Sequence, residues 1–168
     1  MPNKIKLIIF DFDGTLGDTR RNIVTTMQMT IAEHQLPYRH EDECASVIGL
    51  PLAGCFKTLF PDIQEELIIR CSETYRRIFN ENLKKIQPQA FPGIVDTLAE
   101  LHQKGIVLTI ASSRSRNSLT ELTHNMGIAD YISLLLGADD VKEAKPKPEP
   151  VLKTLAAMHF DASETLVV

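Results

Sequence analysis

The chain has 168 residues, of which 43% are hydrophobic and 24% charged, and its formal net charge is −4 at pH 7. This is the composition of an ordinary globular protein, and the length allows one sizeable core with a small insertion. Because the charge balance is slightly acidic, it provides no basic surface for nucleic acid and no polybasic stretch for a membrane, so we expect neither partner.

The first predicted element is a strand over residues 5–10, a nearly continuous aliphatic run typical of the centre of a parallel sheet. It leads directly into Asp11-Phe12-Asp13-Gly14-Thr15. Ligands of α/β sheets bind at the carboxyl ends of central strands, and two carboxylates this close repel each other unless a cation or proton lies between them. The motif indicates a metal ion or acid–base chemistry, although Asp, Gly and Thr are also common loop residues.

Residues 18–85 are predicted to form helices and no strand. Apolar residues recur there at helical spacing, and Pro and Gly interrupt the pattern, which predicts helices over 18–35, 41–48, 51–60 and 63–85. Asp18 and Thr19 are both candidates for the N-cap of the first helix. This stretch is therefore predicted to be a block of helices inserted after the first strand.

From Gly93 onward, predicted strands alternate with predicted helices. The expected helices cover 94–105, 115–126 and 148–158, and the expected strands cover 106–111, 131–136 and 165–168. This alternation predicts a parallel sheet covered on both faces. We expect an α/β core made of residues 1–16 and 88–168, with a helical unit over 17–87.

Two later segments carry polar groups where ligands could bind. Ser112 and Ser113 follow the strand 106–111 and precede a helix, whose free N–H groups favour an anion, but turn and capping roles fit them equally well. Lys145 lies in the segment 142–150, where three Pro residues at alternate positions restrict the backbone. If the backbone holds Lys145 in place, its ammonium group could bind a phosphate. The alternative is that the segment is a solvated linker.

Taken together, the Asp11–Thr15 motif, Ser112 at the end of a strand and Lys145-Pro146 resemble the haloacid dehalogenase superfamily of hydrolases, over nearly the whole chain. The helical insert is similar to the small cap of the phosphoglycolate phosphatase and β-phosphoglucomutase branch. The resemblance implies a Rossmann-like, three-layer α/β fold with a parallel sheet and an inserted α-helical cap domain.

The same resemblance implies a role for each motif residue. Asp11 would be the nucleophile that forms an aspartyl-phosphate, and Asp13 the general acid and base. Mg²⁺ would be held by the Asp11 side chain and the backbone carbonyl of Asp13. The implied phosphate-binding residues are Thr15, Ser112, Ser113 and Lys145.

The segment around Gly49 and Leu50 resembles the cap loop that faces the active site in this branch. The mutases of the branch usually place an Arg there, and its absence favours a hydrolase. Lys57, Arg76 and Arg77 are candidates for meeting an anionic substrate tail, although a solvated helix charge is the commoner role for such residues.

The implied function is a Mg²⁺-dependent phosphatase acting on a small phosphorylated metabolite, similar to phosphoglycolate phosphatase. A pyrophosphatase or nucleotidase of the same type is a close alternative. Two further alternatives are a phosphosugar mutase and a non-catalytic phosphate-binding module.

One part of the family pattern is not found in this sequence. The family has a further acidic motif after a fourth strand, whereas the sequence ends at Val168 inside the predicted strand 165–168. Asp139 and Asp140 do not convincingly replace it and are expected to be turn residues or a pair that supports the site from behind its direct ligands. We therefore expect the natural protein to continue with that motif, which the intact mass of the native gene product would test.

The remaining expectations concern location and assembly. The N-terminus does not resemble a signal peptide, because Lys4 and Lys6 interrupt its apolar residues, and no apolar run is long enough to span a bilayer. The three cysteines form no C-x-x-C pair, which favours free thiols over a disulfide or a zinc site. We expect a cytoplasmic protein that is a monomer or a weak dimer.

Overall fold

The computed structural model describes residues 5–168. The chain divides into two compact units, one of Met1–Gly17 with Ala90–Val168 and the other of Asp18–Gln89. The boundaries expected from the sequence lie between residues 16 and 17 and between residues 87 and 88.

The first unit is built on a four-stranded parallel sheet with the strand order β5-β4-β1-β6. The strands are β1 (Leu7–Phe10), β4 (Val107–Ala111), β5 (Leu134–Leu136) and β6 (Thr165–Val167). All four residues of β1 are buried, as expected for a central strand covered on both faces. Because Phe10 is paired with Ile110, the segments after β1 and β4 leave the sheet side by side.

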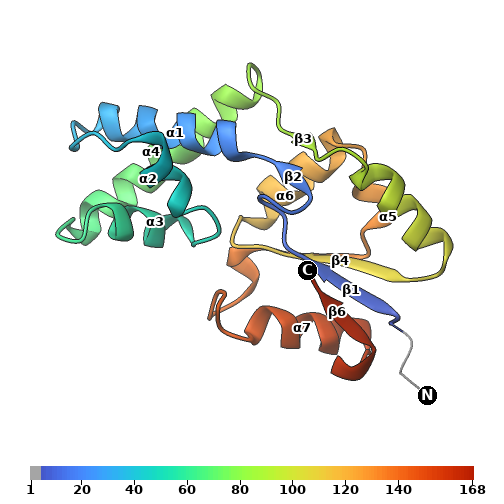
Figure 1. Cartoon of the computed structure of the whole chain (residues 1–168). Coiled ribbons are helices and arrows are strands. Elements are labelled where there is room, and N and C mark those ends of the chain that lie inside the picture. The colour runs from blue at the N-terminus through green and yellow to red at the C-terminus, as the bar shows by residue number, and fades with distance from the viewer. Residues whose placement is uncertain (1–4) are drawn as a thin grey trace. The chain divides into compact units, whose positions relative to one another are not determined.

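Three helices cover this sheet, namely α5 (Ile94–Gln103), α6 (Arg116–Asn125) and α7 (Glu149–Met158). In Figure 1, α5 and α6 lie on one face of the sheet and α7 on the other. Apolar side chains of α7 and the residues after it pack on a buried cluster of the strands that comprises Leu7, Ile9, Ala111 and Leu136. The predicted three-layer parallel α/β arrangement is therefore confirmed.

The structure shortens all four predicted strands, most of all the one over 131–136, and adds two small ones. The segment Ala129–Tyr131 is a 3₁₀ turn, so β5 starts only at Leu134 rather than at residue 131. Gly17–Asp18 (β2) and Gln89–Ala90 (β3) form a two-stranded sheet that was not predicted. Strands of two residues are too short to show the alternation from which strands are recognised in a sequence.

The second unit consists of α1 (Arg20–Glu33), α2 (Glu41–Ser46), α3 (Leu52–Leu59) and α4 (Glu65–Leu83), as the helical pattern predicted. Helices α1 and α4 lie side by side (Figure 1). Their interface includes a buried polar pair, in which Asn82 Nδ2 donates to Thr26 Oγ1 at 3.1 Å. Of the helices in residues 5–168, none is both long and apolar enough to cross a membrane.

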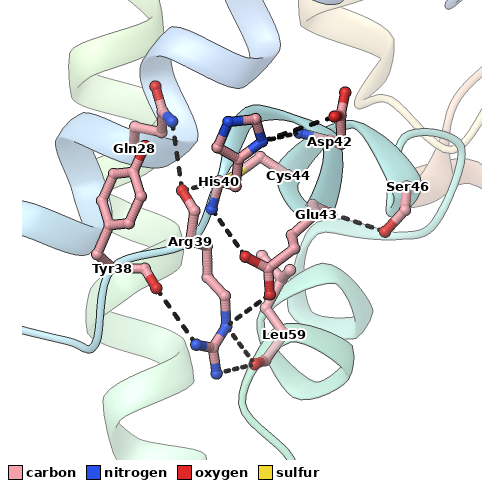
Figure 2. Close-up of polar contacts among 9 residues, drawn as sticks. All are labelled: Gln28, Tyr38, Arg39, His40, Asp42, Glu43, Cys44, Ser46 and Leu59. Atoms are coloured by element: carbon pink, nitrogen blue, oxygen red, sulfur yellow. Dashed lines mark hydrogen bonds and ion pairs between the residues drawn. The ribbon is translucent and has the colours of Figure 1, made fainter.

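Arg39 connects the start of α2 with the end of α3 (Figure 2). Its guanidinium donates twice to the Leu59 carbonyl, at 3.1 and 2.9 Å, and lies 4.6 Å from the centre of the Phe60 ring. The neighbouring residue His40 caps α2, while its own backbone N–H donates to Glu43 at 2.8 Å. The contacts satisfy polar groups at two helix ends that would otherwise lack partners.

All three cysteines are buried, and none of them takes part in a disulfide within the described residues. Burial raises the pKa of the thiols of Cys44 and Cys71, both of which lie in the second unit. A thiol with a raised pKa carries little of the reactive thiolate at neutral pH, so these side chains serve as core residues.

Candidate active site

Two residues predicted to act together, Asp11 and Lys145, are in direct contact. The Lys145 Nζ donates to Asp11 Oδ1 at 2.7 Å, and the two side chains are 32% and 29% exposed. Asp11 directly follows β1, and Lys145 comes from the loop that precedes α7. The pair is therefore accessible at the carboxyl end of the central strand, where ligands of parallel sheets bind.

A tight turn after β1 presents the two carboxylates. The carbonyl of the buried residue Phe12 accepts the backbone N–H groups of residues 15–17, at 3.0 to 3.3 Å. Gly14 has a φ of +82°, a backbone conformation that residues other than glycine rarely adopt. Thr15 lies half-buried within this turn. The sequence Asp-x-Asp-Gly-Thr thus closes a compact loop on the end of the strand.

Asp13 forms a two-point ion pair with Arg114. The guanidinium donates to Asp13 Oδ1 at 2.6 Å and to Oδ2 at 3.2 Å, and the two side chains are only 11% and 9% exposed. Arg114 was not among the predicted site residues. The pairing of β1 with β4 brings the ends of both strands to one edge of the sheet, but it does not indicate which residue after β4 contacts Asp13.

Ser112 and Ser113 lie at the same edge of the sheet. Ser112 is buried, and its hydroxyl accepts the backbone N–H of Arg114 at 3.3 Å. Neither serine is the N-cap of α6, because Ser115 occupies that position. The Ser113 hydroxyl oxygen is buried and has no hydrogen-bond partner among the described residues.

Asp139 and Asp140 organise the turn after β5, as the sequence predicted. Asp139 Oδ1 accepts the backbone N–H of Arg116 at 2.8 Å, and Asp140 accepts the N–H of Gly137 at 2.8 Å and the Arg116 guanidinium. Burial raises the pKa of Asp140, but the hydrogen bonds from Arg116 and Gly137 outweigh this effect and hold the pKa below its ordinary value. Both carboxylates are thus committed to this turn.

Gly137 lies where two backbone segments pass very close. A Cβ added there would lie 2.3 Å from the Arg116 nitrogen and 2.7 Å from the Arg114 carbonyl oxygen.

We expect Gly137→Ala to lower the free energy of unfolding by about 3 kcal/mol, since backbone atoms must shift, and to lower kcat by displacing Arg114. Urea unfolding with matched kinetics measures both. Gly54→Ala in α3 is the control, because its Cβ would make only ordinary contacts; equal stability of the two variants would contradict the prediction.

The loop that carries Lys145 is held by Glu149, the first residue of α7. Its carboxylate accepts the backbone N–H of Lys142 at 3.0 Å and that of Glu143 at 2.7 Å. These hydrogen bonds keep the pKa of Glu149 below its ordinary value. The side chain therefore connects the start of this loop to the first residue of α7, and Lys145 reaches Asp11 from the segment between them.

We expect Glu149→Gln to lower kcat/KM by about ten- to a hundredfold, because a misplaced Lys145 loses its alignment. The two N–H groups donate to different oxygens of Glu149, and an amide replaces one of these oxygens with a donating NH₂ group, so one contact is lost. Glu143→Gln is the matched control, since that side chain is exposed. Steady-state kinetics of both variants measure the effect, and equal loss in the two would count against this role.

The stability of the Glu149 contact depends on pH in a defined direction. Because its pKa is lower in the folded than in the unfolded chain, the contact stabilises above the ordinary Glu value of about 4.3 and is lost as pH falls through the lower folded value. The stability difference between the native protein and Glu149→Gln is therefore expected to shrink below that pH.

The predicted cap residues lie in the second unit. Gly49 and Leu50 belong to the loop between α2 and α3, where Gly49 has a φ of +96° and Leu50 is exposed. Arg77, one of the candidates for a substrate tail, is instead paired with Glu33 at 2.6 Å and with Glu81 at 3.0 Å. These contacts favour the surface-charge role for Arg77.

Within residues 5–168, no group of three or more His, Cys, Asp or Glu side chains is placed to hold a metal ion. Asp11 and Asp13, which follow β1, would offer a carboxylate and a backbone carbonyl to a metal ion. Mg²⁺ in phosphate-handling sites is commonly held by one or two carboxylates together with water and substrate oxygens. The chemistry of this small donor set fits such an ion.

The fold is that of a known class of hydrolase. Residues 8–168 match the model of the haloacid dehalogenase-like hydrolases, and the chain belongs to this family. The expected family resemblance is thereby confirmed.

Three curated relatives illustrate the similarity. The chain is 34% identical to probable phosphatase IndB of Dickeya dadantii, over 96% of this chain and 71% of that protein. It is 34% identical to pyrophosphatase PpaX of Anoxybacillus flavithermus, over 98% of this chain and 74% of that protein. It is 28% identical to a phosphoglycolate phosphatase of Aquifex aeolicus, over 98% and 75% respectively.

A solved structure is similar over the same region. The crystal structure of a hydrolase from Pseudomonas syringae has a TM-score of 0.85 and 25% sequence identity, covering 96% of this chain and 74% of that one.

Proposed function

We propose that the protein is a Mg²⁺-dependent phosphatase that hydrolyses a small phosphorylated metabolite through an aspartyl-phosphate on Asp11. The observation that carries this proposal is the 2.7 Å contact between the accessible Asp11 carboxylate and the Lys145 ammonium at the end of β1. A carboxylate nucleophile beside a fixed cation is what transfer of an anionic phosphoryl group requires.

In the first half of the reaction, an oxygen of Asp11 attacks phosphorus. The new Asp11–phosphorus bond forms as the bond from phosphorus to the leaving oxygen breaks, and that oxygen takes a proton from Asp13. Water then attacks the aspartyl-phosphate, and Asp13 accepts its proton. Phosphate is released, and both carboxyl groups return to their initial state.

Lys145 is the main partner proposed for the phosphoryl oxygens. Its ammonium already contacts Asp11, so a phosphoryl group on that side chain would lie beside it, and the charge would stabilise the transition state. Ser112, Ser113 and Thr15 are proposed to add hydroxyl or backbone N–H contacts from the same edge. The Ser113 hydroxyl has no partner among the described residues, which leaves it uncommitted to any other structural role.

Mg²⁺ would be held by the Asp11 carboxylate and the Asp13 carbonyl, and when bound it would neutralise charge on the phosphoryl oxygens. Gly49 and Leu50 are proposed to belong to a cap that excludes water and recognises the leaving group of the substrate. We propose a reducing, cytoplasmic location, in which the three buried cysteines would remain reduced.

Two substrate classes are supported by the relatives. The first candidate is a small phosphorylated acid, which the similarity to a phosphoglycolate phosphatase supports. The second candidate is inorganic pyrophosphate, which the similarity to a pyrophosphatase supports.

The test is a panel of phosphorylated compounds assayed for phosphate release with full-length protein and Mg²⁺. The panel contains phosphoglycolate, pyrophosphate, nucleoside monophosphates and sugar phosphates. We expect release from at least one of the first two, and its loss with EDTA. Isomerisation of a sugar phosphate without phosphate release would instead indicate a mutase, and no turnover of any compound would overturn the proposal.

A further inference from the structure

We propose that Arg114 is a positioning residue that holds the Asp13 carboxylate ready to accept a proton from the attacking water. This inference rests on the proposed function, since it assigns a role within the hydrolysis of the aspartyl-phosphate. It names a residue whose side chain contacts Asp13 rather than Asp11.

The two ion pairs at this edge of the sheet differ in geometry and in exposure. Lys145 makes one contact to Asp11, and the side chains in that pair are about a third exposed. Arg114 engages both oxygens of Asp13, and both side chains of that pair are nearly buried, at 9% and 11% exposed. The first pair is open to an incoming phosphoryl group, whereas the second is enclosed and fixed at two points.

Arg114 is itself held on several sides. Its Nη1 donates to Ser118 Oγ at 3.1 Å, and its backbone N–H donates to Ser112 Oγ at 3.3 Å. Its carbonyl accepts the backbone N–H of Ala138 at 2.8 Å. Because backbone and side chain are both anchored, Arg114 can define where the Asp13 carboxylate points.

The step that needs this orientation is the second half of the reaction. A water oxygen forms a bond to phosphorus, the Asp11–phosphorus bond breaks with its electron pair returning to the Asp11 carboxylate, and the water proton passes to Asp13. Because one guanidinium engages both oxygens of Asp13, the plane of that carboxylate is fixed, and with it the direction from which the water proton must approach.

The experiment uses p-nitrophenyl phosphate, whose leaving group departs without a proton, so that the aspartyl-phosphate forms even when Asp13 is impaired. Full-length Arg114→Gln is mixed with this substrate, quenched in acid, and examined by intact mass for one added phosphoryl group. We expect the phosphorylated form to accumulate and steady-state turnover to fall by about a hundredfold, the scale of a lost general base.

Two further variants separate position from charge. Arg114→Lys keeps the charge but not the two-point contact, and we expect partial recovery of turnover. Arg116→Gln removes a guanidinium two residues away that pairs with Asp140, and we expect no accumulation of phosphorylated protein. If circular dichroism shows that Arg114→Gln is unfolded, Arg114→Lys is used for the test in its place. We still expect the phosphorylated form of that variant to accumulate.

A double variant decides whether Arg114 acts through Asp13. In an Asp13→Asn background, Arg114→Gln is expected to change neither turnover nor the phosphorylated fraction. A further, multiplying loss would overturn the inference, as would a rise in KM without accumulation, which is the result expected if Arg114 binds the substrate directly. If the native protein and every variant show neither phosphate release nor a phosphorylated form, the proposed function itself fails.

Discussion

Asp11→Asn is expected to lower phosphatase turnover by at least about three orders of magnitude, the scale on which enzymes lose activity when the nucleophile is removed. The amide has nearly the same shape as the carboxylate but no negative charge, so it cannot attack phosphorus. Its oxygen can still accept the hydrogen bond from Lys145, so we expect the fold to be kept. The measurement is kcat on the best substrate of the panel, with a thermal unfolding curve for each protein.

Asp96→Asn is the matched control for this change. Asp96 is exposed in the first turn of α5, within the same unit of the structure, so the same chemical substitution should leave kcat unchanged. Activity of Asp11→Asn near the native level, in protein free of deamidated product, would show that this carboxylate is not the nucleophile.

Removing the ammonium by Lys145→Met has the second largest expected effect. We expect kcat/KM to fall by about a hundred- to a thousandfold, because a fixed charge aimed at the transition state is lost. The effect on stability should be under about 1 kcal/mol, since exposed ion pairs contribute little and this pair is about a third exposed. Kinetics and urea unfolding of the same preparations measure the two quantities.

Lys147→Met is the control for this variant, because Lys147 is an exposed residue of the same loop. Lys145→Arg should recover part of the activity, since it keeps the charge on a longer side chain of different shape. The assignment would be wrong if the two Met variants lost activity equally, which would point to the net charge of the loop rather than to one contact.

Much of the candidate site could be predicted because it follows from strand order. Residues after the strands of a parallel sheet emerge at one edge, so Asp11 after β1 and the Ser112 segment after β4 had to lie close. The contact between Lys145 and Asp11 required only that the loop before α7 return to that edge. The proline-rich composition of that loop fitted both a positioned lysine and a solvated linker, and the structure pairs Lys145 with Asp11.

The role of Arg114 could not be predicted in the same way. A lone Arg after two serines has no periodicity and matches no motif, and most such residues are solvated. Its pairing with Asp13 depends on the register between β1 and β4 and on anchors such as Ser118, four residues further along α6. Gly137 is similar, because its closeness to the Arg116 backbone exists only in the folded chain.

By itself, the sequence determined the alternation of strands and helices, the inserted helical block and the carboxylates at the end of the first strand. It could do so because hydrophobic periodicity and turn residues act over short stretches of chain. Only the tertiary structure decided which charged groups pair: Lys145 with Asp11 and Arg114 with Asp13. The reason is physical, since these partners are separated by more than a hundred residues and meet only when the parallel strands align.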